Sequence, residues 1–164
     1  MKYFDEGDIL LSDFDGVFLD SQKRFEEVMK EETSLEKWMD FLSGIHWKSF
    51  IRDCEFIPGA LETFTELQKL QILKGFITCI HSFEEGKEKI LFLRELGFKV
   101  PIYYTLPEQQ KSQIYVPNAK VILLDDKISN CTEWELKNGR SILYNPSFKS
   151  TSKKYVKYLT DLLK

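Results

Sequence analysis

The sequence lacks the features that define several classes of protein. It has three cysteines in 164 residues, no low-complexity tract, and no apolar run long enough to span a membrane. Cys54, Cys79 and Cys131 are odd in number and lie far apart, without the spacing of zinc ligands. We therefore expect free thiols in a reducing cytoplasm rather than disulfides. The first eight residues, MKYFDEGD, contain no apolar signal-peptide core, which also favours a cytoplasmic protein.

An excess of charge of one sign is also missing. The formal net charge is -3, and the 23 lysines and arginines are spread along the chain. We therefore expect no binding to a nucleic acid duplex and no attachment to a membrane surface. The chain is long enough to bury a core as one domain, and its 43% hydrophobic content is typical of a soluble globular protein. The sequence leaves the oligomeric state open, a homodimer included.

Short apolar stretches alternate with amphipathic ones through most of the chain. Strands are predicted at residues 9–11, 76–80, 100–104, 121–124 and 141–144. Helices are predicted at residues 60–72, 84–96, 129–137 and 151–163, with a weak helix or turn at 109–114. This alternation predicts an α/β fold in three layers, a Rossmann-like parallel sheet of about five strands with helices on both faces.

Residues 21–57 show helical patterns only, at about 24–32, 34–44 and 46–54. We interpret them as a small helical cap inserted after the first strand. Residues 1–20 and 58–164 then form the core, and the insertion would cover the carboxyl end of the sheet.

Two carboxylates follow the first predicted strand directly. Asp13 and Asp15 come one residue apart after the apolar residues 9–11, and Gly16 stands behind them. Ligands of open α/β sheets bind just beyond the carboxyl ends of the strands, so this is a candidate site. Glycine lets the backbone turn sharply and approach a ligand closely. A strand ending in an Asp-rich turn without any catalytic role is the alternative interpretation.

Further polar residues follow the other strands in a recognisable order. Ser82 follows the second strand, Lys111 precedes the fourth, and Asp125 and Asp126 end the fourth in the run LLDDK. Together with the DFDGV motif at residues 13–17, this order resembles the four motifs of the haloacid dehalogenase (HAD) superfamily. The resemblance covers about residues 8–146 without the insertion, and it depends on the order of several strand ends rather than on any single motif.

The resemblance implies a hydrolase that acts on phosphoric monoester bonds through an aspartyl-phosphate. Asp13 would be the nucleophile, and Asp15 would protonate the leaving oxygen and then activate water. Because a phosphate ester repels a carboxylate, a cation is needed, and the implied cofactor is Mg²⁺. Its implied ligands are the Asp13 carboxylate, the Asp15 backbone carbonyl and Asp125, with Asp126 binding through water or supporting the ligands from behind.

Phosphate binding is assigned by the same resemblance to Lys111, Ser82 and Gly16. Lys99 and Lys120 are alternatives to Lys111, but Lys120 directly precedes a strand and so starts at the wrong end of the sheet.

Two neighbours of Ser82 also need an interpretation. Thr78 competes with Ser82 but lies inside the predicted strand, so Ser82 is preferred. His81 is a candidate for contact with substrate, although a lone histidine is more often structural.

The insertion would determine the choice of substrate. It contains four aromatic residues, Trp38, Phe41, Trp47 and Phe50. We favour the interpretation that most of them form the small core of the insertion, while Trp47 and Phe50 are candidates for contact with substrate.

The short length, the small cap and the LLDDK run look most like the 5'-(deoxy)nucleotidase branch of the superfamily. The expected partner is thus a small phosphorylated metabolite, with a nucleoside monophosphate favoured. A phosphatase for a sugar or amino-acid phosphate and a non-catalytic binding relative remain alternatives. Retention of both Asp13 and Asp15 argues against the non-catalytic relative, since a binding module has no need of the second acid.

Overall fold

The computed structural model describes residues 1–29, 34–147 and 154–164. Within them, six parallel strands form one sheet in the order β3-β2-β1-β4-β5-β6. The strands are β1 (Ile9–Ser12), β2 (Leu73–Cys79), β3 (Ile102–Thr105), β4 (Val121–Asp125), β5 (Arg140–Tyr144) and β6 (Tyr155–Val156). The chain builds the sheet outward from β1 in one direction and then, from β4 onward, in the other. The boundary between β1 and β4 is therefore the topological switch point, where α/β sheets bind their ligands.

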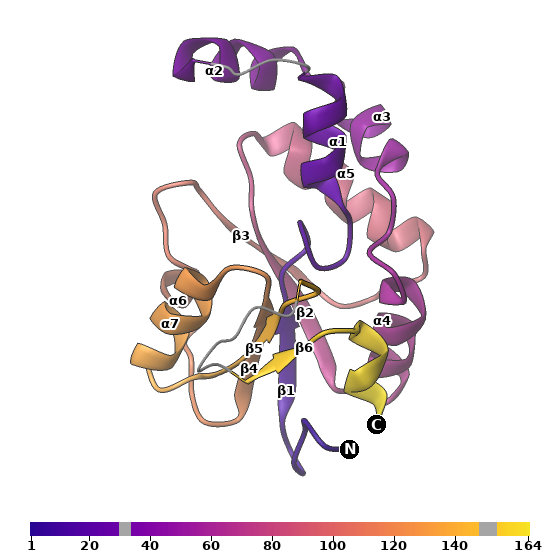
Figure 1. Ribbon diagram of the computed structural model, residues 1–164, viewed down its shortest axis with the longest axis vertical. Coiled ribbons are helices and arrows are strands. Elements are labelled where there is room, and N and C mark those ends of the chain that lie inside the picture. The colour runs from indigo at the N-terminus through magenta and orange to yellow at the C-terminus, as the bar shows by residue number, and fades with distance from the viewer. Residues whose placement is uncertain (30–33, 148–153) are drawn as a thin grey trace.

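Helices cover both faces of this sheet, which confirms the predicted three-layer α/β fold. Figure 1 shows α6 and α7 on one side of the strands and α4, α5 and the 3₁₀ helix η1 on the other. Their bounds are α4 (Ala60–Lys69), α5 (Phe83–Glu95), α6 (Lys111–Ile114), α7 (Ile128–Leu136) and η1 (Leu159–Leu163). The predicted helices at 60–72, 84–96, 109–114 and 129–137 therefore exist, with ends displaced by one to three residues.

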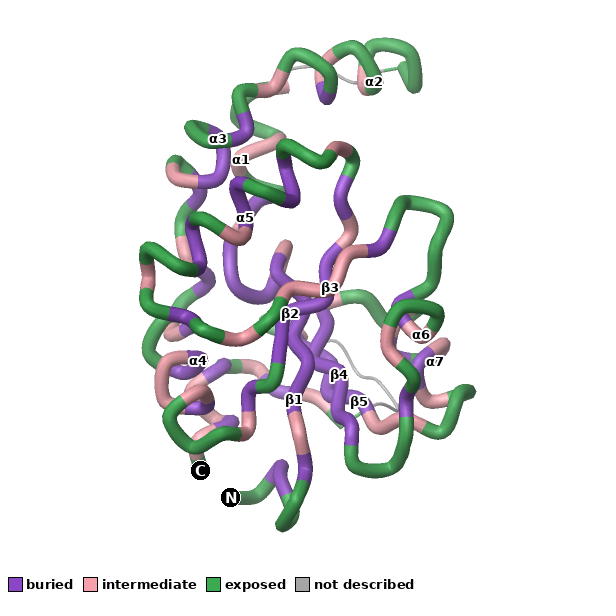
Figure 2. The backbone as a smooth tube through the Cα atoms, turned by 180° about the vertical axis from the view of Figure 1, so that it is seen from behind, coloured by how far each residue is buried: buried purple, intermediate pink, exposed green. Residues whose placement is uncertain are grey.

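The alternation of side chains along each strand explains why the strands read as nearly continuous apolar runs. Leu10 and Leu11 of β1 are both fully buried but belong to different hydrophobic clusters. Leu10 packs in the large cluster with Phe76, whereas Leu11 packs with Leu123 and Trp134. Both faces of a central parallel strand are covered by helices. Burial of each leucine stabilises the folded protein by about 1.5–3 kcal/mol. Figure 2 shows the central strands as buried.

The segment after β1 is helical, as expected. It contains α1 (Ser21–Val28), α2 (Leu35–Gly44) and α3 (Trp47–Asp53). In Figure 1 these helices lie beyond the end of the sheet to which β1 leads, opposite the chain termini. The helix predicted at 24–32 begins earlier than expected, because the Asp20 side chain accepts from the backbone N–H of Lys23 and caps α1. Residues 30–32 of that prediction lie outside the described residues.

An ion-pair cluster connects the insertion to the core. The guanidinium group of Arg52 on α3 lies 3.1 Å from Glu88 and 2.6 Å from Glu95, both on α5. The end of the insertion is therefore fastened to the helix that follows β2. That residues 21–57 form a separate cap remains a prediction.

The prediction of a final helix over residues 151–163 is wrong for residues 154–158, whereas residues 159–163 are helical but form a 3₁₀ helix. Tyr155 and Val156 instead form β6, which adds a sixth strand at the outer edge of β5. Leu159 and Leu162 are buried in the 3₁₀ helix η1. Apolar residues three apart are compatible with an α-helix and with a 3₁₀ helix. Residues 155–156 form a strand because they pair with the open edge of β5. Residues 151–153 lie outside the described residues.

In the described part of the chain, no helix has both the length and the apolar character needed to cross a bilayer.

Candidate active site

Strand register brings the first two acids together. Ser12 of β1 pairs with Leu124 of β4, and the backbone N–H of Asp13 donates to the Leu124 carbonyl at 2.8 Å. Asp13 and Asp125 therefore lie next to each other at the carboxyl ends of the adjacent strands β1 and β4, at the switch point of the sheet. Both are buried, Asp125 completely. Their proximity follows from two parallel neighbouring strands that each end in an aspartate.

A third carboxylate completes a cluster suited to a metal ion. Each of Asp13, Asp125 and Asp126 offers an oxygen, and these three atoms lie within 4.8 Å of one another. One oxygen of Asp126, Oδ1, is buried without a hydrogen-bond partner, which is costly unless a cation satisfies it. Hard carboxylate oxygens are the ligands that Mg²⁺ prefers. The residues present therefore fit a divalent cation such as Mg²⁺.

Lys111 is the cation nearest to this cluster. It is the first residue of α6, is buried, and places its Nζ 3.0 Å from Asp13 Oδ2 and 2.6 Å from Asp125 Oδ2. Burial opposes its charge, but the two carboxylates outweigh burial and raise the pKa of the Lys111 ammonium. This lysine is therefore the one that the fold brings to the acids. Lys120 is at the other end of β4, 2.8 Å from the Glu6 carbonyl, and the exposed Lys99 contacts Gln68 through its backbone.

Asp125 is held in place by its own loop and the following helix. It accepts the backbone N–H of Lys127 at 2.8 Å and the side-chain amide of Asn130 at 3.0 Å. Burial and the crowding of carboxylates raise the pKa of Asp13 to about 8, against the opposing effect of Lys111. Burial, with Asp125 next to it, raises the pKa of Asp126 to about 6. The cluster therefore holds more negative charge than Lys111 alone neutralises, which favours an additional cation.

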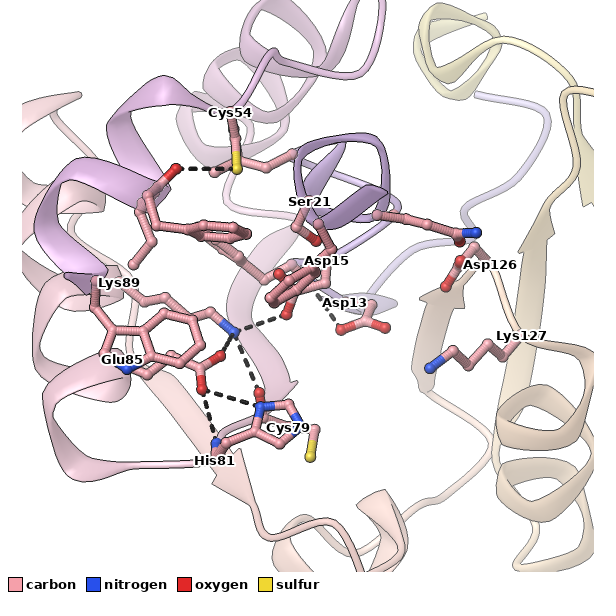
Figure 3. Close-up of a pocket in the computed structure, with 18 of the residues that line it drawn as sticks. Asp13, Asp15, Ser21, Cys54, Cys79, His81, Glu85, Lys89, Asp126 and Lys127 are labelled. Atoms are coloured by element: carbon pink, nitrogen blue, oxygen red, sulfur yellow. Dashed lines mark hydrogen bonds and ion pairs between the residues drawn. The ribbon is translucent and has the colours of Figure 1, made fainter. Parts of the chain in front are cut away.

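Asp15 faces a different set of partners. Its Oδ2 lies 2.7 Å from Lys89 Nζ and accepts the Thr78 hydroxyl at 3.0 Å. Burial acts to raise the pKa of Asp15, but Lys89 and the hydroxyl groups of Ser21 and Thr78 outweigh it and lower the pKa below its usual value. Asp15 is therefore held as a carboxylate, and Figure 3 shows the Lys89 amine joined to it.

The acids line one side of a cavity of about 650 Å³ beneath the insertion. Four aromatic residues of the insertion line it too: Phe25, Trp38, Trp47 and Phe50. Trp47 and Phe50 are also buried in the core cluster, which fits a packing role, and their contact with substrate stays a prediction. His81 contributes another part of the wall, and its Nδ1 lies 3.2 Å from Glu85 Oε2. The cavity therefore combines acidic and basic side chains of the core with aromatic side chains of the insertion.

Comparison with known proteins identifies the fold. No protein-family model matches the sequence, and no curated protein does either. Solved structures do match: a HAD-superfamily hydrolase from Ehrlichia chaffeensis superposes with a TM-score of 0.59, at 15% identity over 94% of this chain and 93% of that one. A predicted phosphatase from Clostridium acetobutylicum gives a TM-score of 0.64 at 13% identity, covering 94% and 95%. The chain has the HAD-hydrolase fold.

A third structure with the HAD fold was solved with its metal. It is a protein of Bacillus subtilis described as a HAD-hydrolase bound to magnesium, with a TM-score of 0.59 and 15% identity over 94% of this chain and 96% of that one. The resemblance to the HAD superfamily is thus confirmed at the level of the fold. These structures do not support the nucleotidase branch in particular.

Two phosphate-binding candidates lie differently from the expectation. The Ser82 hydroxyl accepts the backbone N–H of Glu85 at 3.1 Å and caps α5, and Ser82 does not line the cavity. The amide of Gly16 donates to the Leu19 carbonyl at 2.8 Å, so a phosphate would have to compete for it. Ser82 is therefore explained by helix capping, while Gly16 serves the turn beside Asp126.

Sequence reasoning set Thr78 aside and missed Lys89 and Glu85. Thr78 does lie in β2, but it is the next-to-last residue of the strand, close enough to the edge to reach Asp15. Lys89 and Glu85 are four apart on the buried face of α5, which Phe92 and Leu93 continue. A charged pair at helical spacing on the face that also carries Phe92 and Leu93 was the available signal.

Proposed function

We propose that this protein is a magnesium-dependent phosphomonoesterase in which Asp13 forms an aspartyl-phosphate. The observation that carries the proposal is the joint position of Asp13: it belongs to the three-acid cluster and lies 3.0 Å from the buried ammonium of Lys111. A nucleophile for an anionic ester needs positive charge around it, which Lys111 supplies on one side and a Mg²⁺ held by the three acids would supply on the other.

The reaction has two steps. In the first, an oxygen of Asp13 attacks the phosphorus, the bond to the ester oxygen breaks, and the alcohol leaves with a proton that the monoanionic phosphate ester brings and the Asp15 carboxylate relays to it. In the second, water attacks the phosphoryl group, Asp15 takes its proton, and the bond to Asp13 breaks to release phosphate. Bound Mg²⁺, held by Asp13, Asp125 and Asp126, would supply Lewis-acid stabilisation of the charge on the phosphoryl oxygens. Lys111 adds a fixed positive charge.

Phosphate release from p-nitrophenyl phosphate tests this function directly. We expect turnover by the wild type with Mg²⁺, loss of turnover on chelation, and no measurable turnover by Asp13→Asn. Asp5→Asn is the matched control, because Asp5 is exposed near the amino end of β1, far from the acids. Absence of metal-dependent phosphate release from any monoester would contradict the proposal and favour a binding role.

For the substrate, we propose a nucleoside 5'-monophosphate. Phe25, Trp38 and Trp47 line the same cavity as the acids, and their rings suit the flat face of a base. We further propose that residues 21–57 act as a cap that keeps bulk water from the acids. A panel of nucleoside, sugar and amino-acid phosphates tests the substrate class, and equal kcat/KM across the panel would contradict it.

A further inference from the structure

Lys89 is a buried charge that the two-step reaction does not itself require. It is 1% exposed and projects from the middle of α5 into the space behind the acids. Its Nζ lies 2.7 Å from Asp15 Oδ2, 2.7 Å from Glu85 Oε1, 3.1 Å from Thr78 Oγ1 and 3.2 Å from the Cys79 carbonyl. Figure 3 shows this amine lying between Glu85 and Asp15.

The donors of Lys89 are fully occupied within the protein. An ammonium group has three N–H bonds, and four acceptors already surround this one. Lys89 therefore has no donor left for a substrate phosphate, and its influence must pass through the groups it holds. Lys111 differs, since it lies among the acids that would receive the phosphoryl group.

Glu85 fixes the position of Lys89. One carboxylate oxygen pairs with Lys89, and the other accepts the backbone N–H of His81 at 2.7 Å and lies 3.2 Å from the His81 ring. The Lys89 amine also lies 5.3 Å from the centre of the Phe14 ring, which separates Asp13 from Asp15 in the sequence. The lysine thus packs against the loop that carries both proposed catalytic acids.

Stability of the fold alone does not account for the buried ion pair of Lys89 and Glu85. Replacing a buried ion pair by apolar side chains is often neutral or stabilising, and the buried face of α5 holds Phe92 and Leu93 besides the charged Glu88, which pairs with Arg52 instead. What the pair does accomplish is geometric: it holds the Asp15 carboxylate against Lys89 and Thr78 at the wall of the cavity. The Asp15 side chain nevertheless stays 37% exposed toward the cavity, where a water molecule can reach it.

We propose that Lys89, held by Glu85, is a positioning residue that orients the Asp15 carboxylate toward the water that hydrolyses the aspartyl-phosphate. In that step the water oxygen bonds to phosphorus, its proton passes to Asp15, and the bond from phosphorus to Asp13 breaks. This inference rests on the proposed phosphatase function. It goes further in separating the two steps: where the leaving group needs no proton, Lys89 serves only the second step.

The test is a rapid-mixing measurement with p-nitrophenyl phosphate, comparing the wild type with Lys89→Met. Nitrophenolate leaves without a proton, so the first step and its rate should change little. The second step should slow by about 10²-fold or more, the usual loss when a general base is displaced. Lys89→Met should therefore show a burst of one nitrophenolate per active site, followed by slow turnover. Phosphorylated protein should accumulate and be measurable by mass spectrometry.

Lys87→Met is the matched control, since Lys87 is an exposed lysine of the same helix. It should show wild-type kinetics. If Lys89→Met does not fold because Glu85 is left unpaired, the double variant Lys89→Met/Glu85→Gln removes both charges and should show the same burst. Melting temperatures of all variants establish that they are folded.

The outcomes separate this inference from the function on which it rests. A wild type without metal-dependent turnover overturns both. An active wild type with burst and steady-state rates that fall together, or with no change in Lys89→Met, overturns the role of Lys89 only. A merely structural lysine would give one of these last two results.

Discussion

The ammonium group of Lys111 lies 3.0 Å from the carboxylate of Asp13, although 98 residues separate them in the chain. The same ammonium lies 2.6 Å from Asp125, so one lysine bridges the acids that end β1 and β4. All three side chains are less than a tenth exposed. Their interactions are therefore little screened by solvent, and the two carboxylates stabilise the charge of Lys111.

Lys111→Met should destabilise the metal-free protein by about 3–5 kcal/mol, because it leaves buried acids without a partner. Mg²⁺ should restore part of this loss, so the rise in melting temperature on adding Mg²⁺ should be larger for the variant than for the wild type. Thermal unfolding with and without the ion measures this. Lys120→Met is the control, since that lysine is exposed and lies at the far end of β4. Equal effects of the two substitutions would contradict the expectation.

Magnesium affinity should increase as the pH rises. The pKa of Asp13 is raised to about 8 and that of Asp126 to about 6, both above the 3.8 of an ordinary aspartate. Between pH 4 and those values the folded protein holds protons that the unfolded chain has lost, so these groups make the metal-free protein less stable as the pH rises. Because Mg²⁺ needs the ionised carboxylates, it must displace these protons at low pH.

Isothermal titration calorimetry at pH 5.5, 6.5, 7.5 and 8.5 measures this pH dependence. The affinity should rise by up to about tenfold per pH unit for each proton displaced. Asp126→Asn should weaken binding and flatten the rise around pH 6. An affinity independent of pH would show that the cluster is already ionised without the ion.

Gly16 should not tolerate a side chain. Its φ is +76°, and a Cβ there would lie 2.4 Å from Asp126 Oδ2. Gly16→Ala should therefore lower the free energy of unfolding by about 1–2 kcal/mol through backbone strain. The added methyl group should also displace Asp126 and weaken Mg²⁺ binding. Gly7→Ala is a close control, because Gly7 has a φ of +80° but nothing within 4 Å of the added atom. It should lose stability similarly while binding Mg²⁺ like the wild type, and equal metal affinities in both variants would refute the steric explanation.

Trp38→Ala should affect substrates according to their leaving groups. Trp38 lines the cavity and packs against Phe25 at 5.3 Å between ring centres. Loss of a stacking surface costs about 1–3 kcal/mol, so KM for a nucleoside monophosphate should rise about 5- to 150-fold. KM for a phosphate ester without a ring should hardly change. Met39→Ala is the control on the same helix, because Met39 is 59% exposed and does not line the cavity. Parallel rises in KM for both kinds of substrate would contradict a stacking role.

Local sequence patterns were sufficient to predict strands β1 to β5 and to place Asp13 and Asp125 at the ends of two of them. Buried parallel strands are apolar on both faces, so β1 and β4 were visible as short runs such as the one from Val121 to Leu124. Asp13 and Asp125 follow those runs directly, and parallel strands place their carboxyl ends at one edge. The final segment was misjudged, because the pairing of Val156 with Tyr144 depends on the open edge of β5 and not on local spacing.

The sequence by itself therefore determined the layered α/β fold and the two strand ends that bring Asp13 and Asp125 together, since both follow from periodicity and from the geometry of parallel sheets. Only the tertiary structure decided that Thr78 rather than Ser82 faces Asp15, and that Lys89 reaches it from a helix 74 residues further along. The physical reason is that a buried charge is stabilised by whichever partners surround it after folding. Those partners come from separate elements, and no local pattern records their distances.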